Sequence, residues 1–367
     1  MNKQNASEDL LSGQAWNDFC DRLKQAGELV QRENAAKDPL SQAEGYRYLT
    51  RMLRAGLESF IEHSDSGFPE LRSPCHETIK MGADNPDNYY QNAPINPKYE
   101  YRITGTRGTV DYLGISAVVN SYGSAGSMVT DGFLDSNSIT VDANGQIDII
   151  ISQQEQPGDW LSLGTNTNAV NVRQTFKDRT TEKAAELRIE RILAADSRPE
   201  PLTPEKMNKA LHSVTTFLTG ATNMFEDWSE SFIPFMNQLP AADQAYCQLI
   251  GGDPNIFYFH SAWEIADDEV LVLHAERIPE CQTWNFQLDN WWMESLDYRY
   301  HTIHINKHTA VYDEDGGVTI VISHTKPPHS KNWVETAGHN IGTMCWRWIG
   351  ASDHPPVAAK VVKFADL

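Results

Sequence analysis

The feature that most constrains the fold is a pattern of residues that occurs twice along the chain. Each copy begins with a D-x-x-G turn, and a serine follows the glycine after seven residues. A proline, a tryptophan and an arginine then follow in the same order in both copies. The first copy consists of Asp142, Gly145, Ser152, Pro157, Trp160 and Arg173, and the second of Asp313, Gly316, Ser323, Pro327, Trp333 and Arg347. Repeated landmarks at near-equal spacing predict two related lobes within one chain.

Short runs with a two-residue hydrophobic period flank each copy, and Gly, Asn and Pro separate these runs. Such runs are typical of β-strands that bury one face. Asn144-Gly145 lies between two of them and predicts a tight hairpin. The predicted strands are 99–104, 109–119, 139–141, 146–152, 169–176 and 185–192 in the first lobe, and 255–260, 269–275, 282–288, 299–306, 317–323 and 342–348 in the second. We therefore expect each lobe to form an antiparallel sandwich or barrel.

Apolar residues recur at three- and four-residue steps near the N-terminus and again after Thr203-Pro204, which predicts amphipathic helices in both places. The predicted fold class is α+β, mainly β, with two antiparallel β-sandwich lobes, an N-terminal helical hairpin and a helical linker. The expected segments are a helical hairpin at 1–63, an ordered loop at 64–98, a first β lobe at 99–195, a linker with helices at 196–253 and a second β lobe at 254–367.

The charge balance excludes several classes of partner. The chain has 30 basic and 50 acidic residues, a formal net charge of −20. Nucleic acids and anionic membrane surfaces are bound by basic patches, so we expect neither as a partner. The sequence shows no long apolar run and no basic start followed by an apolar segment, which predicts a cytoplasmic protein. Its five scattered cysteines lack a C-x-x-C pair and predict reduced thiols.

Several segments resemble a known family. The second lobe has Asp315-Gly316, followed at 332–339 by Asn-Trp-Val-Glu-Thr-Ala-Gly-His, where the family usually has N-W-L-D-T. This pattern resembles the bacterial family named domain of unknown function 1214. The segments 44–49, 82–88 and 292–299 are similar to its longer members. The resemblance implies a jelly-roll-like form for the two β-sandwich lobes, and it implies no activity.

The candidate catalytic residues lie in the stretch 281–348, which contains six of the ten tryptophans and six of the twelve histidines. We select His304 and His339 as candidate general bases and Glu294 as a carboxyl group that works with them. His301 and His304 point to opposite faces of a strand, and the stretch has no H-E-x-x-H motif. We therefore predict no metal site.

Candidate ligand-binding residues surround these groups. Trp291 and Trp292 offer apolar ring surface, and Arg299 offers a charge that orients a ligand. The alternative is that this loop only pins the edge of the sandwich. Asn285 and Gln287 share the polar face of the strand 282–288, which either faces solvent or lines a cleft.

Two further candidates each allow a structural and a functional role. Arg347, like Arg173 in the first lobe, either anchors the fold through a buried carboxylate or binds the carboxylate of a ligand. Asp87 could coordinate calcium or bind sugar hydroxyls, although a plain Asx turn explains its Asn-Pro-Asp-Asn segment equally well.

The leading hypothesis is a cofactor-independent enzyme, a hydrolase, lyase or isomerase, that acts on a small organic molecule by acid–base chemistry. It is based on the difference between the lobes, because the second carries the histidines and tryptophans. The alternative is a non-enzymatic jelly-roll module that binds a ligand or carbohydrate on tryptophan platforms. A third hypothesis is a structural protein, and a homo-oligomer is left open.

Overall fold

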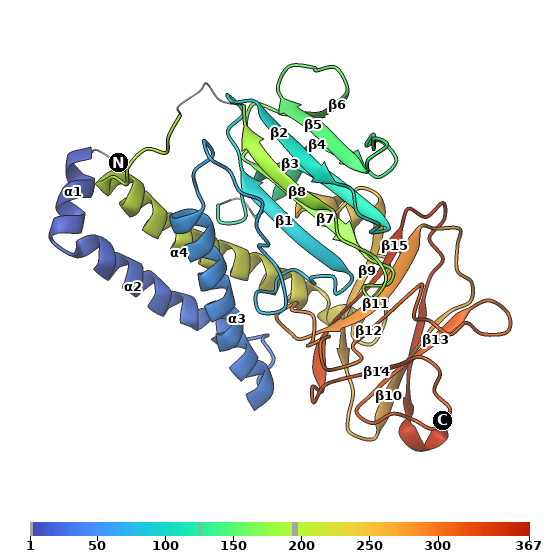
Figure 1. Ribbon diagram of the computed structural model, residues 1–367. Helices are drawn as coiled ribbons and strands as arrows, with labels where there is room; N and C mark the ends of the chain where they lie inside the picture. Colours follow the sequence, from blue (N-terminus) through green and yellow to red (C-terminus); the bar gives the residue numbers. More distant parts are fainter. Residues whose placement is uncertain (1–2, 125, 193–196) are drawn as a thin grey trace. The chain divides into compact units, whose positions relative to one another are not determined.

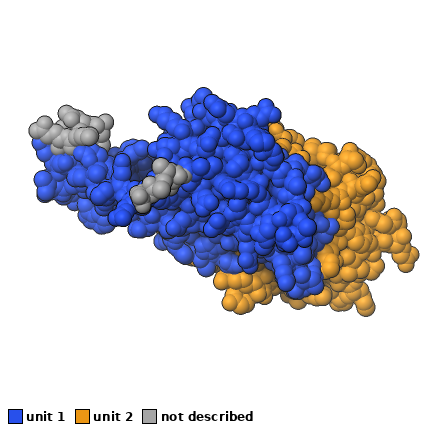
Figure 2. All heavy atoms as spheres, turned by 45° about the horizontal axis from the view of Figure 1, so that its top comes forward, with its two compact units in different colours: residues 1–29, 49–79, 87–222 blue, residues 30–48, 80–86, 223–367 orange. Residues whose placement is uncertain are grey.

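The structure is a computed structural model that describes residues 3–124, 126–192 and 197–367. The chain forms two compact units, neither of which is continuous in sequence (Figures 1 and 2). Unit 1 comprises residues 1–29, 49–79 and 87–222, and unit 2 comprises residues 30–48, 80–86 and 223–367. Two short N-terminal segments therefore belong to the same unit as the second predicted lobe.

The predicted helices are present, although the first is divided. The helices are α1 (Lys3–Leu11), α2 (Gln14–Ala26), α3 (Pro39–Leu57), α4 (Pro204–Ser231) and α5 (Gln244–Leu249), with shorter helical turns η1 (Gly27–Gln31), η2 (Glu58–Glu62), η3 (Ile233–Phe235) and η4 (Phe364–Asp366). Gly13 separates α1 from α2 with a positive φ of 80°. In unit 1, Phe19 of α2 packs in one apolar cluster with Leu211 and Val214 of α4.

A helix that could cross a lipid bilayer was not found in the described ranges of the chain.

Unit 1 contains a sandwich of two four-stranded sheets. One sheet has the order β1-β7-β3-β4 and the other has the order β6-β5-β2-β8. The strands are β1 (Asn88–Pro94), β2 (Tyr101–Thr106), β3 (Tyr112–Asn120), β4 (Met128–Asp135), β5 (Gln146–Ser152), β6 (Asp159–Ser162), β7 (Ala169–Thr175) and β8 (Glu186–Arg191). Side chains of both sheets, among them Ile115 and Ile149, meet in one buried apolar core.

Unit 2 contains a second sandwich. Its sheets have the orders β12-β11-β15-β9 and β14-β13-β10-β16. The strands are β9 (Ile256–Glu264), β10 (Glu269–Ala275), β11 (Thr283–Asp289), β12 (His304–Asn306), β13 (Val318–Ser323), β14 (Trp333–Glu335), β15 (Ile341–Ile349) and β16 (Ala358–Lys363). The core between the sheets is rich in tryptophan, and Trp284 and Trp346 stack with ring centroids 4.8 Å apart.

The two sandwiches have the same strand order. Adding eight to each strand number of unit 1 reproduces both sheets of unit 2. Each sandwich also has one parallel pair, β5–β6 in unit 1 and β13–β14 in unit 2. Eight strands in two sheets are what a jelly roll has, whereas a jelly roll is antiparallel throughout, so the parallel pair distinguishes this topology.

The parallel pairs show why the repeated serine and tryptophan occur in both copies of the sequence pattern. The indole Nε1 of Trp160 donates to the Ser152 hydroxyl at 3.2 Å, and that of Trp333 donates to the Ser323 hydroxyl at 3.0 Å. Each hydroxyl also reaches a carbonyl oxygen two residues further on. The serine thus closes the loop between the two parallel strands in each unit.

Several elements differ from the sequence prediction. Strands β1, β4, β6, β14 and β16 were not predicted, and 139–141 forms no strand. The predicted strand 299–306 is reduced to the three residues of β12. β6, β14 and β12 have four residues or fewer, which is too short for a two-residue period to be recognised.

Replacing Ser323 with Ala tests the serine–tryptophan contact in unit 2. The substitution removes the acceptor of the Trp333 N–H, so we expect the free energy of unfolding to fall by about 1–2 kcal/mol. Chemical denaturation measures the change. Ser352→Ala is the control, because Ser352 is exposed and its hydroxyl makes only a long 3.4 Å hydrogen bond. Equal effects of the two substitutions would contradict the assignment.

Candidate functional site

The sheet β12-β11-β15-β9 presents a polar face on the side opposite its apolar core. Side chains alternate along each strand, so Trp284, Phe286 and Leu288 of β11 enter the core. Asn285, Gln287 and Asp289 therefore share the other face. The sequence left open whether this polar face meets solvent or lines a cleft. In the structure these three side chains are buried.

Strand pairing aligns polar side chains across this face. One row runs through His304, Gln287, Cys345 and His260, and the adjacent row runs through Asn306, Asn285, Arg347 and Tyr258. Hence the predicted residues Asn285, Gln287, His304 and Arg347 occupy one face of one sheet. His304 is partly exposed on the edge strand β12.

Hydrogen bonds connect the arginine of this face to an aspartate. Arg347 Nη1 donates to Gln287 Oε1 at 2.6 Å, and Gln287 Nε2 donates to Asp289 Oδ1 at 2.5 Å. The Arg347 guanidinium lies 6.0 Å from the centre of the Tyr258 ring. The sequence allowed Arg347 to pair with a buried carboxylate, and in the structure it reaches the carboxyl of Asp289 through the amide of Gln287.

The segment 80–86 covers the face within unit 2. The carbonyl oxygen of Ala83 accepts from Arg347, and that of Asp84 accepts from Gln287 Nε2 at 2.9 Å. The Asn85 side chain accepts from Asn285 at 2.7 Å. Of these three contacts only that of Asn85 depends on the side chain, because every residue has a backbone oxygen.

Two buried charged residues hold this segment in place. The Lys80 ammonium donates to the carbonyl oxygens of Ser295 and Leu296 at 2.6 and 3.0 Å. The Asp84 carboxylate accepts from the backbone N–H and the hydroxyl of Ser295 at 2.9 and 2.7 Å. A buried charge is tolerated only when it is surrounded by hydrogen-bond partners, and here the loop after β11 supplies them.

Asp289 is the most perturbed group of the face. It is 0% exposed, and its Oδ2 has no hydrogen-bond partner in the part of the chain that the structure describes. Burial raises the pKa of Asp289 to about 8, and the Asp84 carboxylate acts in the same direction. The hydrogen bond from Gln287 and the charges of Arg347 and Lys80 oppose this shift. The side chain is therefore a neutral acid at neutral pH.

His260 and Cys345 form a second buried pair on the same face. Cys345 Sγ lies 3.6 Å from His260 Nε2, and the imidazole stacks on Phe232 with centroids 5.7 Å apart. Burial lowers the pKa of His260 well below its ordinary value, and the charge of Arg347 adds to this effect. Burial raises the pKa of Cys345 to about 12, so the thiol stays protonated and is a poor nucleophile.

A separate buried network contains the other predicted catalytic residues. His339 Nε2 lies 2.7 Å from Glu44 Oε2, and His339 Nδ1 lies 2.9 Å from the carbonyl oxygen of Thr336. The Asn290 amide donates to Glu44 and to Glu294, both at 2.9 Å. Both ring nitrogens of His339 thus face acceptors, which is the arrangement of an imidazolium paired with a carboxylate.

The pKa values of this pair move apart. Burial by itself raises the pKa of Glu44, but the hydrogen bond and charge of His339 outweigh it and hold this pKa below its ordinary value. Burial by itself lowers the pKa of His339, but the hydrogen bond and charge of Glu44 raise it. Arg47 also binds Glu44, at 2.5 Å. A saturated ion pair of this kind is well suited to fixing residues 39–48, the first part of α3, within unit 2.

The tryptophans of the predicted pocket pack inside unit 2. Trp291 and Trp292 are 2% and 1% exposed. Trp292 Nε1 donates to the Ser41 carbonyl oxygen at 2.8 Å, and its ring lies against Gly45, where a Cβ atom would come within 2.5 Å of the ring. These contacts correspond to the structural alternative for this loop, in which the rings anchor it.

Two predicted residues lie apart from both groups. Arg299 forms an ion pair with Asp297 at 2.7 Å, and both side chains are more than one third exposed. Asp87 belongs to unit 1, where its carbonyl oxygen accepts from the backbone N–H of Phe176 at 2.8 Å. The sequence could not place these residues, because each lies in a loop whose course depends on tertiary contacts.

The corresponding face of unit 1 keeps the arginine and loses the acid. Arg173 pairs with Tyr90 across β7 and β1 and lies 5.8 Å from its ring, as Arg347 does with Tyr258. Four residues before the arginine, Thr343 in unit 2 pairs with Asp289. Four residues before Arg173, Ala169 in unit 1 pairs with Val118, so Val118 occupies the position that corresponds to Asp289. Asn92 and Asn171 stand where unit 2 has His260 and Cys345. Asp289, His260 and Cys345 thus have no titratable counterpart at the corresponding positions of unit 1.

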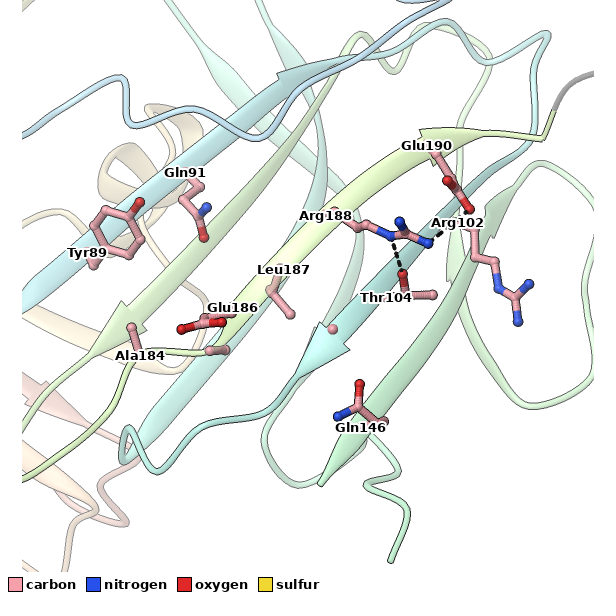
Figure 3. A pocket seen from close by; sticks show the side chains of 12 residues that line it. Tyr89, Gln91, Arg102, Thr104, Gln146, Ala184, Glu186, Leu187, Arg188 and Glu190 are labelled. Atoms are coloured by element: carbon pink, nitrogen blue, oxygen red, sulfur yellow. Dashed lines mark hydrogen bonds and ion pairs between the residues drawn. The ribbon is translucent and has the colours of Figure 1, made fainter. Parts of the chain in front are cut away.

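No cluster of three or more His, Cys, Asp or Glu side chains able to hold a metal ion occurs among the residues that the structure describes. An open hollow of about 900 Å³ lies on unit 1 over β2 and β8 (Figure 3). Two of its charged side chains bind neighbours, since Arg188 Nε donates to the Thr104 hydroxyl at 3.1 Å and Arg102 pairs with Asp148. None of the predicted site residues lines it.

The family model described as "Protein of unknown function (DUF1214)" matches residues 270–352, which run from β10 through β15. A crystal structure of an uncharacterised protein from Burkholderia cenocepacia is 48% identical, covering 98% of this chain and 99% of that chain, with a TM-score of 0.96. The chain belongs to the DUF1214 family. The match contains most of the polar face, including Asp289 and Arg347.

A crystal structure of a protein from Vibrio parahaemolyticus aligns over 86% of this chain and 98% of that chain. Its identity is 10% and its TM-score is 0.47, too low to carry an argument about the fold. A comparison with curated proteins gives no match.

Substituting His339 with Gln tests the ion pair with Glu44. Because the pKa of His339 is raised in the folded state, its contribution to the stability of the fold is complete below pH 6.5. That contribution is lost as the pH rises through the folded pKa. Because the pKa of Glu44 is lowered in the folded state, its contribution to the stability of the fold is complete above pH 4.5 and is lost at lower pH. The melting temperatures of the parent and His339→Gln should therefore differ most between these two values.

Removing the carboxylate alone should be more damaging, because Glu44→Gln leaves a buried imidazolium without its partner, at a cost of about 3 kcal/mol or more. Thermal unfolding across a pH series measures both effects. His354→Gln, at an exposed histidine, is the control. If His339→Gln showed no maximum in that pH window, the ion pair would be absent.

Replacing Asp289 with Asn should stabilise the protein at neutral and alkaline pH. The pKa of Asp289 is raised from 3.8 to about 8, so the folded state loses stability, relative to the variant, as pH rises through this interval. The difference should grow by about 1.4 kcal/mol per pH unit at most and level off above the folded pKa. Chemical denaturation at a series of pH values measures it.

Asp297→Asn is a control of opposite sign. The hydrogen bond from Arg299 lowers the pKa of Asp297 from 3.8 to about 2. This carboxylate therefore stabilises the fold fully above pH 3.8, and its contribution is lost as the pH falls through the folded pKa. A stability difference for Asp289→Asn that is independent of pH would show that this carboxyl titrates normally.

Proposed function

We propose that the second lobe is a small-molecule enzyme that uses acid–base chemistry on the polar face of sheet β12-β11-β15-β9. The observation that carries the proposal is the Asp289 side chain, a fully buried acid with an oxygen that has no partner in the described chain. Buried carboxyl groups with raised pKa values cluster at catalytic sites, because such an acid can release and recover a proton near neutral pH.

His304 is the proposed second proton-transfer group. It lies directly across from Gln287, so it is the diagonal neighbour of Asp289 at a distance of about 7–8 Å. Its position on a partly exposed edge strand gives it contact with solvent, whereas Asp289 is enclosed. In this proposal Asp289 gives a proton to the substrate and His304 accepts one, with exchange to water on the side of β12.

Arg347 and Gln287 are proposed as positioning residues. The guanidinium fixes the amide, and the amide fixes the acid, so the reactive oxygen has a defined direction. Pre-organised groups of this kind lower the cost of reaching the transition state. The reaction needs no cofactor in this proposal, and its partner is a small organic molecule in the cytoplasm. We also propose that the lobes arose by duplication, with unit 1 as the lobe that carries no catalytic groups.

The alternative of a carbohydrate module depends on exposed tryptophan platforms. Trp284, Trp291, Trp292, Trp346 and Trp348 are each 2% exposed or less. Rings in this state serve the core and offer no stacking surface, and Trp333, the sixth tryptophan of this stretch, is partly buried and donates to Ser323. This favours the enzyme over the carbohydrate module.

An unbiased turnover experiment tests the proposal. The protein is incubated with the small-molecule fraction of a bacterial extract, and mass spectrometry follows compounds that are consumed or formed. We expect at least one conversion that Asp289→Asn slows by about 100-fold or more and that His304→Gln also slows. Asp297→Asn, at a side chain that is 39% exposed, and His354→Gln, at an exposed position, should leave the rate unchanged. A conversion that persists in Asp289→Asn, or the absence of any conversion, would refute the proposal.

A further inference from the structure

The orientation of the Gln287 amide is determined by its neighbours. Its oxygen accepts from Arg347, and its nitrogen donates to Asp289 Oδ1 and to the Asp84 carbonyl oxygen. If the amide were rotated by half a turn, its N–H groups would face the N–H groups of Arg347. Its oxygen would then face Asp289 Oδ1 and the Asp84 carbonyl oxygen, which are both acceptors. Arginine has no acceptor and a carbonyl oxygen has no proton, so only one orientation is compatible with all three contacts.

This orientation fixes the position of the proton on Asp289. Oδ1 accepts from the amide, so in the neutral acid the hydroxyl is on Oδ2. The Oδ2 atom is buried and has no hydrogen-bond partner in the described ranges. A buried O–H group without an acceptor is unfavourable by a few kcal/mol, so this group is expected to meet an acceptor from outside the chain.

The surroundings favour an uncharged acceptor. The nearby cations are already engaged by oxygens of the chain, Lys80 by Ser295 and Leu296 and Arg347 by Ala83 and Gln287. The Asp84 carboxylate is close enough to influence Asp289 electrostatically. A ligand anion would be buried beside this negative charge, and N–H groups of the two cations that could bind it already donate to oxygens of the chain, whereas a carbonyl oxygen needs only the Oδ2 hydroxyl.

We propose that the site binds its substrate through an uncharged carbonyl oxygen, which accepts a hydrogen bond from Asp289 Oδ2. This inference rests on the acid–base site proposed above and adds the class of compound, a ketone, aldehyde, ester or amide. Such a hydrogen bond strengthens as negative charge develops on the carbonyl oxygen during reaction. Gln287 is a positioning residue, because it decides which oxygen carries the proton. Asp289 is fully buried, so the carbonyl compound reaches it only when the surrounding chain opens.

Infrared difference spectroscopy on the full chain tests the inference. The carbonyl stretch of a protonated carboxyl group is identified by its loss in Asp289→Asn. The probes are acetophenone and cyclohexanone, with ethylbenzene and cyclohexane as matched compounds without a carbonyl, and benzoate as an anion. We expect both ketones to shift the Asp289 band to lower frequency and the hydrocarbons to leave it unchanged.

Gln287→Leu tests the positioning role. Without the amide the proton can occupy either oxygen, so the shift caused by the ketones should shrink while circular dichroism shows a folded protein. A ketone shift of undiminished size in this variant would remove Gln287 from the proposal.

The outcomes separate the two proposals. If the Asp289 band is present at neutral pH but neither ketone shifts it, or only benzoate does, the carbonyl inference is wrong and the acid remains. A water molecule bound to Asp289 Oδ2 in place of a ligand would give this same outcome, a band that neither ketone shifts. If no band depends on Asp289 at neutral pH, the acid–base proposal itself fails.

Discussion

The burial of the Arg347 guanidinium on one face of a β-sheet is the constraint on which the rest of unit 2 depends. A buried guanidinium needs acceptors around it, and the strands beside it supply the side chains of Gln287, Asn285 and Tyr258. The backbone oxygen of Ala83 supplies a further acceptor from outside the sheet. The segment 80–86 therefore has to lie over the sheet, and its own charges, Lys80 and Asp84, require the loop after β11 in turn.

The contacts that satisfy the charge of Arg347 also determine the surroundings of Asp289. Gln287 is held by the arginine, and it holds Asp289 in one orientation and one protonation pattern. Unit 1 retains the arginine and its tyrosine but has Val118 where unit 2 has Asp289. The arginine–tyrosine pair thus belongs to the scaffold that both lobes share, whereas the acid belongs to unit 2.

The two predicted histidines have different surroundings. His339 is saturated by Glu44 and by a carbonyl oxygen, so its proton stabilises the fold and is not free to be transferred. His304 lies on the same sheet face as Gln287, next to the neutral acid. A histidine held in a buried ion pair and one on a partly exposed edge strand cannot be distinguished by their neighbours in sequence. The distinction comes from Glu44, which is 295 residues away along the chain.

The sequence by itself determined the parts of this protein that depend on local pattern. The two-residue period predicted β5 and β10 with the bounds that they have, and the repeated Asp, Gly, Ser and Trp marked the two lobes. Alternation along β11 also placed Asn285 and Gln287 on one face, because side chains of a strand point to opposite sides in turn.

Only the tertiary structure decided what covers that face. The segment 80–86 lies about 200 positions before the strand that it covers, as the contact between Asn85 and Asn285 shows. Burial raises the pKa of Asp289 to about 8, and Asp84 of this segment adds to the shift. A pKa depends on burial and on nearby charges, and both arise from residues that are distant in sequence. For this reason the sequence could name the strand and its polar face, while the burial and the raised pKa of Asp289 emerged from the fold.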